Sequence, residues 1–336
     1  MCGPERRCTA WISLEPMGVA IQGCLRSPQW LRTLMIPSHH SLLRPLVYFD
    51  TSRETLTCMR TVSHGAFGYI DWGTYRVGDT VDDVYIKRPI HPGKSLLHEA
   101  CMQSLVHTCL ADIGFPHGAP AVRRIFRLHD QSIGFAMEPI DGACTLDQYL
   151  ESVPSSCFAN AMVECLLQLC AMIWHLNSRI GINHRDLTPS NFMVVDHAPI
   201  RKVLTIDTIL LEISSTRSLT LIDFGFSCLG SIETQRADIS LSTVYPSSDP
   251  CPKEGRDLYL FIGHIYIDYY NKLPIQLLRL FESWLHAPGA KLCKMMQKDK
   301  ESSKRWLYFM VGNENITRFP THPLKIVQDL QSYLSL

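Results

Sequence analysis

The chain has 336 residues, 46% of them hydrophobic, which is enough for one large domain or two with a sizeable core. Lysine and arginine together number 32, as do aspartate and glutamate, so the charge balance predicts no general attraction to nucleic acid or to acidic membranes. The 13 cysteines show neither a C-x-x-C pair nor zinc-ligand spacing, which predicts reduced thiols in an intracellular protein, cytoplasmic or nuclear.

Residues 1–56 carry proline, serine, histidine and isolated apolar residues without a sustained period. We interpret them as a poorly defined N-terminal extension to which no function is assigned. The apolar patch at 17–25 contains Gln22 and lacks a small-residue cleavage site, which argues against a signal peptide. No stretch reaches the roughly 18 to 20 unbroken apolar residues of a transmembrane helix, so no membrane association is expected.

The character of the chain changes at residue 57. Three short runs rich in β-branched and aromatic residues predict an antiparallel meander: 57–62, 69–75 and 83–88. Apolar residues at helical spacing then predict an amphipathic helix over 95–109. Two further strands are expected at 124–128 and 133–137.

The rest of the chain is predicted to be mainly helical. Apolar faces indicate four helices: 159–177, 258–270, 273–285 and 324–334. The second is apolar almost all round, which is typical of a buried helix. Residues 201–211 alternate partly between apolar and polar, so an insert at 196–218 is expected to extend a small β-hairpin. A tolerated surface insertion is the favoured interpretation, and a docking role stays open.

Two motifs carry most of the chemistry. Residues 182–191 read I-N-H-R-D-L-T-P-S-N, and residues 221–225 read L-I-D-F-G. They supply one proton acceptor, Asp186, and two hard oxygen ligands suited to Mg²⁺, Asn191 and Asp223. Such a set can surround one triphosphate, and phosphoryl transfer needs little beyond positioning and charge neutralisation.

These motifs resemble the catalytic loop H-R-D-x-x-x-x-N and the D-F-G of eukaryotic-type protein kinases. The resemblance covers residues 57–336 and implies a bilobal, protein-kinase-like α+β fold. Its small antiparallel β N-lobe would span 57–140 and its mainly helical C-lobe 141–336. Asp186 would accept or orient the proton of the substrate hydroxyl, and His184 would be a structural hydrogen-bonding residue. Residues 187–190 lack the Ala-Arg insertion typical of tyrosine kinases, which favours Ser/Thr acceptors.

The resemblance also implies a site for ATP. The segment 62–70 is similar to the phosphate-covering pattern G-x-G-x-x-G-x-V, with Ser63 at the first glycine. Residues 84–87 resemble V-A-I-K, so Lys87 would neutralise phosphates while an ion pair with Glu99 holds it in place. The alternative to this phosphate-binding role is that Lys87 and Glu99 are ordinary surface residues, whose ion pair would contribute little. Residues 135–142 look like the strand that enters the hinge, where Met137 would guard the back of the pocket. The residues implied to bind ATP are Val62, Gly65, Gly68, Ile70, Lys87, Met137, Glu138, Ile140 and Met193.

The chain departs from the family pattern at several positions. Tyr85 stands where the family usually has Ala, and Thr188 where many Ser/Thr kinases have Lys. No A-P-E triplet follows the D-F-G motif, although Asp257 resembles the buried aspartate that ties the next helix to the catalytic loop. These features are similar to those of divergent kinases, including kinases of large DNA viruses, for which the location would be the host cell.

The favoured interpretation is an ATP- and Mg²⁺-dependent protein kinase that acts on Ser/Thr hydroxyls of protein substrates. A pseudokinase that binds partners without catalysis is one alternative, supported by Ser63, Tyr85 and Thr188. The other is a small-molecule kinase of the aminoglycoside or choline type. The sequence D-F-G-F and the long segment that follows it argue against that class.

Overall fold

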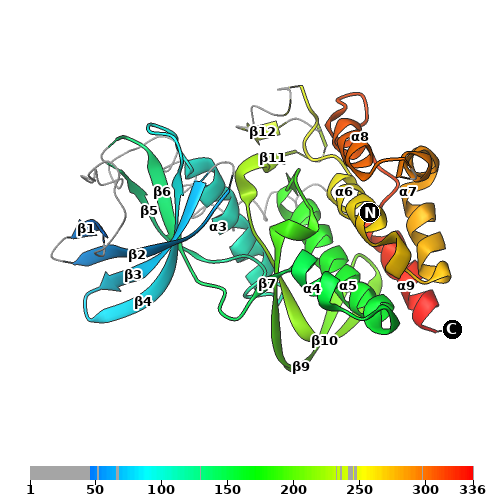
Figure 1. Cartoon of the computed structure of the whole chain (residues 1–336), viewed down its shortest axis with the longest axis horizontal. Coiled ribbons are helices and arrows are strands. Elements are labelled where there is room, and N and C mark those ends of the chain that lie inside the picture. The colour runs from blue at the N-terminus through cyan, green and yellow to red at the C-terminus, as the bar shows by residue number, and fades with distance from the viewer. Residues whose placement is uncertain are drawn as a thin grey trace. The chain divides into compact units, whose positions relative to one another are not determined.

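The computed structural model describes residues 46–50, 53–65, 68–128, 130–231, 233–234, 237–240, 245, 248–296 and 298–335 (Figure 1). Most of the predicted N-terminal extension, residues 1–45, therefore lies outside the described residues. The chain divides into two compact units. Unit 1 contains Met1–Leu105 and Pro120–Ile140, and unit 2 contains Val106–Ala119 and Asp141–Leu336.

Unit 1 is built on an antiparallel six-stranded sheet with the order β1-β2-β3-β4-β6-β5. Its strands are β1 (Leu46–Asp50), β2 (Glu54–His64), β3 (Gly68–Val77), β4 (Thr80–Pro89), β5 (Val122–Arg127) and β6 (Ile133–Met137). All five predicted strands are present. β1 and the first residues of β2 fall inside the range predicted as an extension, so regular structure begins before residue 57.

The two faces of this sheet bury different sets of side chains, because successive residues of a strand point to opposite faces. In β4, Val84 and Ile86 join a buried apolar cluster with side chains of β2, β3 and β5. Lys87 shares the opposite face with Phe135 of β6, its cross-strand neighbour. Phe135 packs there against Ala100 of α3 (Leu97–Ala111). The alternation thus sends Lys87 toward the face that carries α3.

Unit 2 is mainly helical. Its helices are α4 (Leu146–Ser152), α5 (Ser155–Ile180), α6 (Arg256–Tyr269), α7 (Ile275–Met296), α8 (Lys300–Gly312) and α9 (Pro323–Leu334), with short 3₁₀ turns η2 (Pro189–Asn191), η3 (Phe224–Phe226) and η4 (Tyr270–Lys272). Two three-stranded sheets complete it: β10-β9-β7 and β12-β11-β8. Their strands are β7 (Cys144–Thr145), β8 (Ile182–Asn183), β9 (Phe192–Ile206), β10 (Ile209–Leu221), β11 (Cys228–Gly230) and β12 (Ala237–Ser240).

Helices α5 and α6 form the core of unit 2. α5 ends where Gly181 adopts a left-handed conformation (φ 64°) and its N–H bonds the carbonyl of Asn177. By length and composition, α5 is the one described helix that qualifies as a membrane span, yet 72% of its most apolar window is buried in the protein, as in an ordinary core helix. α6 is buried at nearly every position, which confirms the prediction from its apolar sequence.

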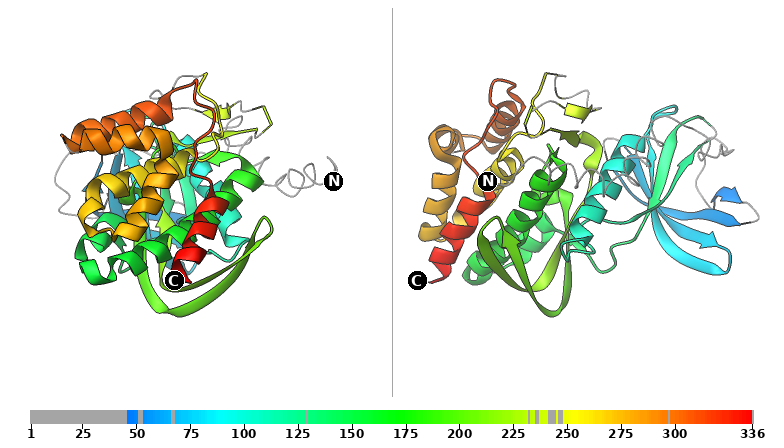
Figure 2. Two further views of the ribbon diagram at one scale, coloured as in Figure 1. Left: turned by 90° about the vertical axis from the view of Figure 1, so that its right-hand side faces the viewer. Right: turned by 180° about the vertical axis from the view of Figure 1, so that it is seen from behind.

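The insert forms a long curved hairpin of β9 and β10, seen in green in Figure 2. The pairing runs from Phe192 opposite Leu221 to Ile206 opposite Ile209, which confirms the predicted hairpin extension. Gln168 of α5 donates to the carbonyl of Arg217, so the base of the hairpin is fixed to the core.

The prediction of reduced thiols is wrong for one pair of cysteines. Cys228 of β11 and Cys251, just before α6, form a disulfide. The two residues are 23 positions apart and carry no spacing signal, and only the folded path of the chain places their Cα atoms 6.4 Å apart. The thiols of five other described cysteines are free: Cys109, Cys144, Cys157, Cys165 and Cys170.

Candidate active site

In unit 1, Lys87 and Glu99 form the predicted ion pair. The Lys87 Nζ atom lies 2.5 Å from Glu99 Oε1, and the two residues are only 9% and 4% exposed. A buried pair of this kind differs from the surface pair considered as the plain alternative, because few solvent molecules compete for either charge. The ion pair fixes the Lys87 ammonium at the start of α3.

The glycine-containing segment is the turn between β2 and β3. The Gly65 N–H donates to the Gly68 carbonyl at 2.9 Å, and the residues between them, 66 and 67, lie outside the described residues. A Cβ atom on Gly68 would lie 2.8 Å from the Arg88 carbonyl oxygen, which explains why glycine stands there. Val62 and Ile70 flank this turn, and Ile70 is the cross-strand neighbour of Lys87.

The end of β6 contains the residues predicted to meet an adenine ring. The Glu138 N–H donates to the Ala121 carbonyl at 2.8 Å. Met137 is the register partner of Tyr85 in β4, so their side chains share one face of the sheet. Tyr85, the unusual residue of the V-A-I-K segment, therefore lies on the same face as Lys87 and beside Met137. Ile140 is the last residue of unit 1.

In unit 2, both carboxylate oxygens of Asp186 are hydrogen-bonded. Asn191 Nδ2 donates to Asp186 Oδ2 at 3.0 Å and to the Asp186 carbonyl at 2.7 Å. The hydroxyl of Tyr308 donates to Asp186 Oδ1 at 2.7 Å. Because Asn191 uses its amide nitrogen on Asp186, its amide oxygen is the end that can serve a cation.

Backbone bonds join the catalytic loop to the D-F-G segment. The Ile222 N–H donates to the Asn191 carbonyl at 3.1 Å, and the Ile222 carbonyl lies 3.0 Å from His184 Nε2. His184 thus makes the structural hydrogen bond predicted for it. Asp223 follows directly, in a left-handed conformation (φ 64°, ψ 71°) that is uncommon outside glycine.

The donor atoms available here suit Mg²⁺. The amide oxygen of Asn191 and the carboxylate of Asp223 are hard oxygen ligands, and the bonded Ile222 links the two residues. No group of three or more His, Cys, Asp or Glu side chains that could hold a metal occurs among the described residues.

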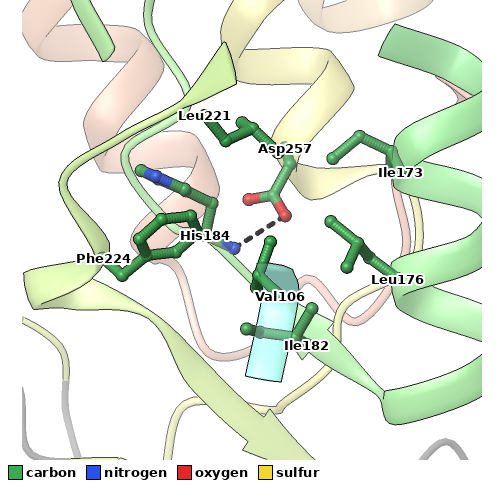
Figure 3. A pocket seen from close by; sticks show the side chains of 8 residues that line it. All are labelled: Val106, Ile173, Leu176, Ile182, His184, Leu221, Phe224 and Asp257. Carbon is green, nitrogen blue, oxygen red and sulfur yellow. Dashed lines mark hydrogen bonds between the residues drawn. The ribbon is translucent and has the colours of Figure 1, made fainter. Parts of the chain in front are cut away.

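Asp257 of α6 is hydrogen-bonded to the backbone of the H-R-D segment, and Figure 3 shows its bond to the His184 nitrogen. Its Oδ2 accepts from the His184 N–H at 2.9 Å and from Asn183 Nδ2 at 3.2 Å, and its Oδ1 accepts from the Arg185 N–H at 2.9 Å. The predicted tie between this helix and the catalytic loop is confirmed. The small pocket beside Asp257 has a mostly apolar lining: Val106, Ile173, Leu176, Ile182, His184, Leu221, Phe224 and Asp257.

One buried carboxylate, Asp249, binds three cations. Its oxygens lie 2.9 Å from Arg185 Nη2, 2.7 Å from Lys253 Nζ and 2.7 Å from Arg256 Nη2, and all four side chains are fully buried. Burial lowers the pKa of Arg185 to about 10 and that of Lys253 to about 8, and the neighbouring Arg256 acts in the same direction. The hydroxyl of Tyr245 donates to the Arg185 carbonyl at 2.6 Å. This cluster fixes the residue directly before Asp186.

Asp249, Tyr308 and helix α8, which carries Tyr308, were not predicted from the sequence. The helix had a signal, because Asp299 caps its N-terminus by accepting from Glu301 N and Ser302 N. The apolar residues Leu307 and Val311 follow at helical spacing. The contacts of Tyr308 with Asp186 and of Asp249 with Arg185 had no signal, since these partners are remote in sequence.

His264 of α6 stands edge-on to the Tyr308 ring, with the ring centroids 5.7 Å apart. Burial, helped by the nearby charge of Lys304, lowers the pKa of His264 to about 4. In the unfolded chain His264 binds a proton below about pH 6.5, so stability is lost as the pH falls from 6.5 toward 4. Between pH 7 and pH 5 this amounts to about 2 kcal/mol. Urea unfolding at pH 7 and pH 5 should show this loss of stability in the wild type and a smaller loss in His264→Phe. Equal losses would contradict the attribution of the pH dependence to His264.

No protein-family model matches the chain, and no curated protein matches its sequence. Among solved structures, a crystal structure of the BubR1 kinase domain is similar, with a TM-score of 0.49 and 11% identity over 99% of this chain and 98% of that one. A likeness of this degree says nothing about activity or substrate. The elements themselves confirm the predicted α+β class: an antiparallel sheet with α3 in the N-terminal part, and a mainly helical C-terminal part.

Proposed function

We propose that the chain is an ATP- and Mg²⁺-dependent protein kinase that phosphorylates Ser/Thr hydroxyls of protein substrates. The observation that carries the proposal is the cluster formed by the two motifs in unit 2. Asn191 bonds the Asp186 side chain and, through its carbonyl, the residue before Asp223. One proton acceptor and two hard oxygen ligands are thereby held by a single set of hydrogen bonds.

Each residue has a defined task. Mg-ATP, when bound, supplies the phosphoryl group and neutralises part of its developing charge. Asn191 and Asp223 would hold the metal ion, and Asp186 would orient the acceptor hydroxyl and take its proton. In unit 1, Lys87, held by Glu99 at 2.5 Å, would neutralise phosphate oxygens.

The resemblance implies nucleotide-binding roles for the remaining predicted residues. The β2–β3 turn would cover the phosphates with the backbone at Gly65 and Gly68. Apolar contacts to the base would come from Val62, Ile70, Met137 and Met193. The Glu138 carbonyl and the Ile140 backbone would bond the adenine edge, a role compatible with the Glu138 N–H already being used by Ala121. An intracellular location, in the host cell if the chain is viral, belongs to the same proposal.

A pseudokinase is the second candidate, and two observations favour it. The Tyr308 hydroxyl already bonds Asp186, and Tyr85 lies on the same sheet face as Lys87. A protein that keeps the fold for binding partners would tolerate both features, whereas an enzyme must move Tyr308 aside before an acceptor reaches Asp186.

Transfer of labelled γ-phosphate from Mg-ATP tests the proposal. We expect label on a generic basic protein such as histone, and none on amino-sugars or choline offered at the same concentration. Label on the small acceptors alone would indicate a small-molecule kinase. Absence of transfer to every acceptor, both in the wild type and in Tyr308→Phe, together with thermal stabilisation by Mg-ATP, would indicate a pseudokinase.

A further inference from the structure

Tyr308 contacts Asp186, a residue 122 positions earlier in the chain. Its hydroxyl donates a 2.7 Å hydrogen bond to Asp186 Oδ1. Burial, together with the charge of Asp186 and this bond, raises the pKa of Tyr308 well above its ordinary value, so the phenol stays a donor at physiological pH. An acceptor hydroxyl bound for phosphorylation must make the same kind of bond to the same carboxylate.

Helix α8 holds Tyr308 in this place. Leu307, the residue before it, is fully buried against α6, where a Cβ on Gly263 would lie 2.6 Å from Leu307 Cδ1. Glycine at that position lets the two helices approach closely. At the other end of α8, Lys253 Nζ and Arg256 Nε donate to the Val311 carbonyl at 3.1 and 3.0 Å. Cations at a helix C-terminus are stabilising, so the helix is fixed on both sides of Tyr308.

The Tyr308 side chain is less restrained than its helix. It is 39% exposed, whereas Leu307 and Val311 have no exposed surface. Its ring contacts His264 edge-on, and its hydroxyl bonds Asp186. Rotation about the Tyr308 side-chain bonds therefore releases Asp186 without repacking α8.

We propose that Tyr308 is an autoinhibitory gate that occupies the acceptor-hydroxyl position at Asp186, an inference that rests on the proposed kinase activity. Asn191 already holds Oδ2, so a substrate hydroxyl competes with Tyr308 for Oδ1. Only the fraction of molecules with Tyr308 turned away binds the acceptor, and the apparent affinity for the acceptor falls by that fraction. A partner or substrate that draws Tyr308 into its own interface would activate the enzyme.

Steady-state transfer from Mg-ATP to histone tests the gate, with Tyr308→Phe compared with the wild type. The variant keeps the ring against His264 and removes only the competing hydroxyl. We expect the KM for histone to fall about tenfold, with kcat and the KM for ATP unchanged; tenfold corresponds to a closed state favoured by about 1.4 kcal/mol. Tyr270→Phe is the matched control, because Tyr270 belongs to the same unit and is 37% exposed.

The outcomes separate the gate from the proposed function. Transfer that is lost in Asp186→Ala but equal in the wild type and Tyr308→Phe would overturn the gate and leave the kinase assignment standing. A fall in kcat in Tyr308→Phe would also overturn the gate, because Tyr308 would then be a positioning residue. Phosphate found on Tyr308 itself would overturn the gate as well. Transfer by Tyr308→Phe but not by the wild type would support the gate. Absence of transfer in both would overturn the kinase assignment and the gate with it.

Discussion

Asp249→Ala is expected to destabilise unit 2 by about 3–5 kcal/mol, a large part of the total stability of a typical domain. The substitution leaves Arg185, Lys253 and Arg256 buried without the carboxylate that binds all three. Removing one partner of a buried ion pair costs far more than the pair contributes, because the remaining charge keeps its desolvation penalty. Here the loss of one carboxylate leaves three buried cations without their common partner. Lys253, whose pKa is already lowered to about 8, would release its proton first.

Urea unfolding at pH 7 measures this effect. Asp268→Ala is the matched control: it removes the carboxylate of an ion pair with Lys304 at 3.0 Å whose side chains are both more than a quarter exposed. The control should cost less than about 1 kcal/mol, because solvent screens such a pair. If the two variants lost equal stability, the Asp249 cluster would not be the anchor of the segment before α6. Asp249→Asn keeps the shape of the side chain and removes its charge, so its loss of stability should lie between those of Asp249→Ala and Asp268→Ala.

Much of unit 1 and several contacts of the motif residues could be predicted from the sequence, because the signals are local. Runs rich in β-branched and aromatic residues marked the strands, and the helical spacing of apolar residues marked α3. Lys87 and Glu99 were paired only through the resemblance to protein kinases, and the structure shows their ion pair at 2.5 Å. Asp257 was likewise predicted as the tie to the catalytic loop, and its three hydrogen bonds are present.

Most of the unpredicted contacts join segments that are remote in sequence. Tyr308 meets Asp186 across 122 residues, and no local pattern of an exposed helix face indicates which carboxylate it reaches. Asp249 lies in a segment without periodicity, so its charge looked like that of any loop residue. The Cys228–Cys251 disulfide has no spacing signal in a chain with 13 cysteines. Tertiary packing decides each of these contacts.

Asp223→Ala is expected to reduce phosphoryl transfer by about a thousandfold or more while the protein stays folded. In the proposed function the Asp223 carboxylate would be the charged ligand for Mg²⁺, and Asn191 would contribute only a neutral amide oxygen. Fixed charges aimed at the developing charge of the transition state account for losses of this size when one is removed. Mg-ATP should also stabilise the variant less than the wild type in a thermal unfolding experiment.

Because Asp223 has a left-handed backbone conformation, its control variant must change a residue with the same conformation. Asp207, in the turn of the β9–β10 hairpin, is exposed and also has a left-handed conformation, with φ 53° against 64° for Asp223. The left-handed region is unfavourable for Ala at both positions, so Asp207→Ala reproduces the cost in folding free energy without changing the motifs. Transfer should be normal in Asp207→Ala and lost in Asp223→Ala. A folded Asp223→Ala protein with the wild-type rate would rule out a metal-binding role for this carboxylate, and with it the proposed kinase chemistry.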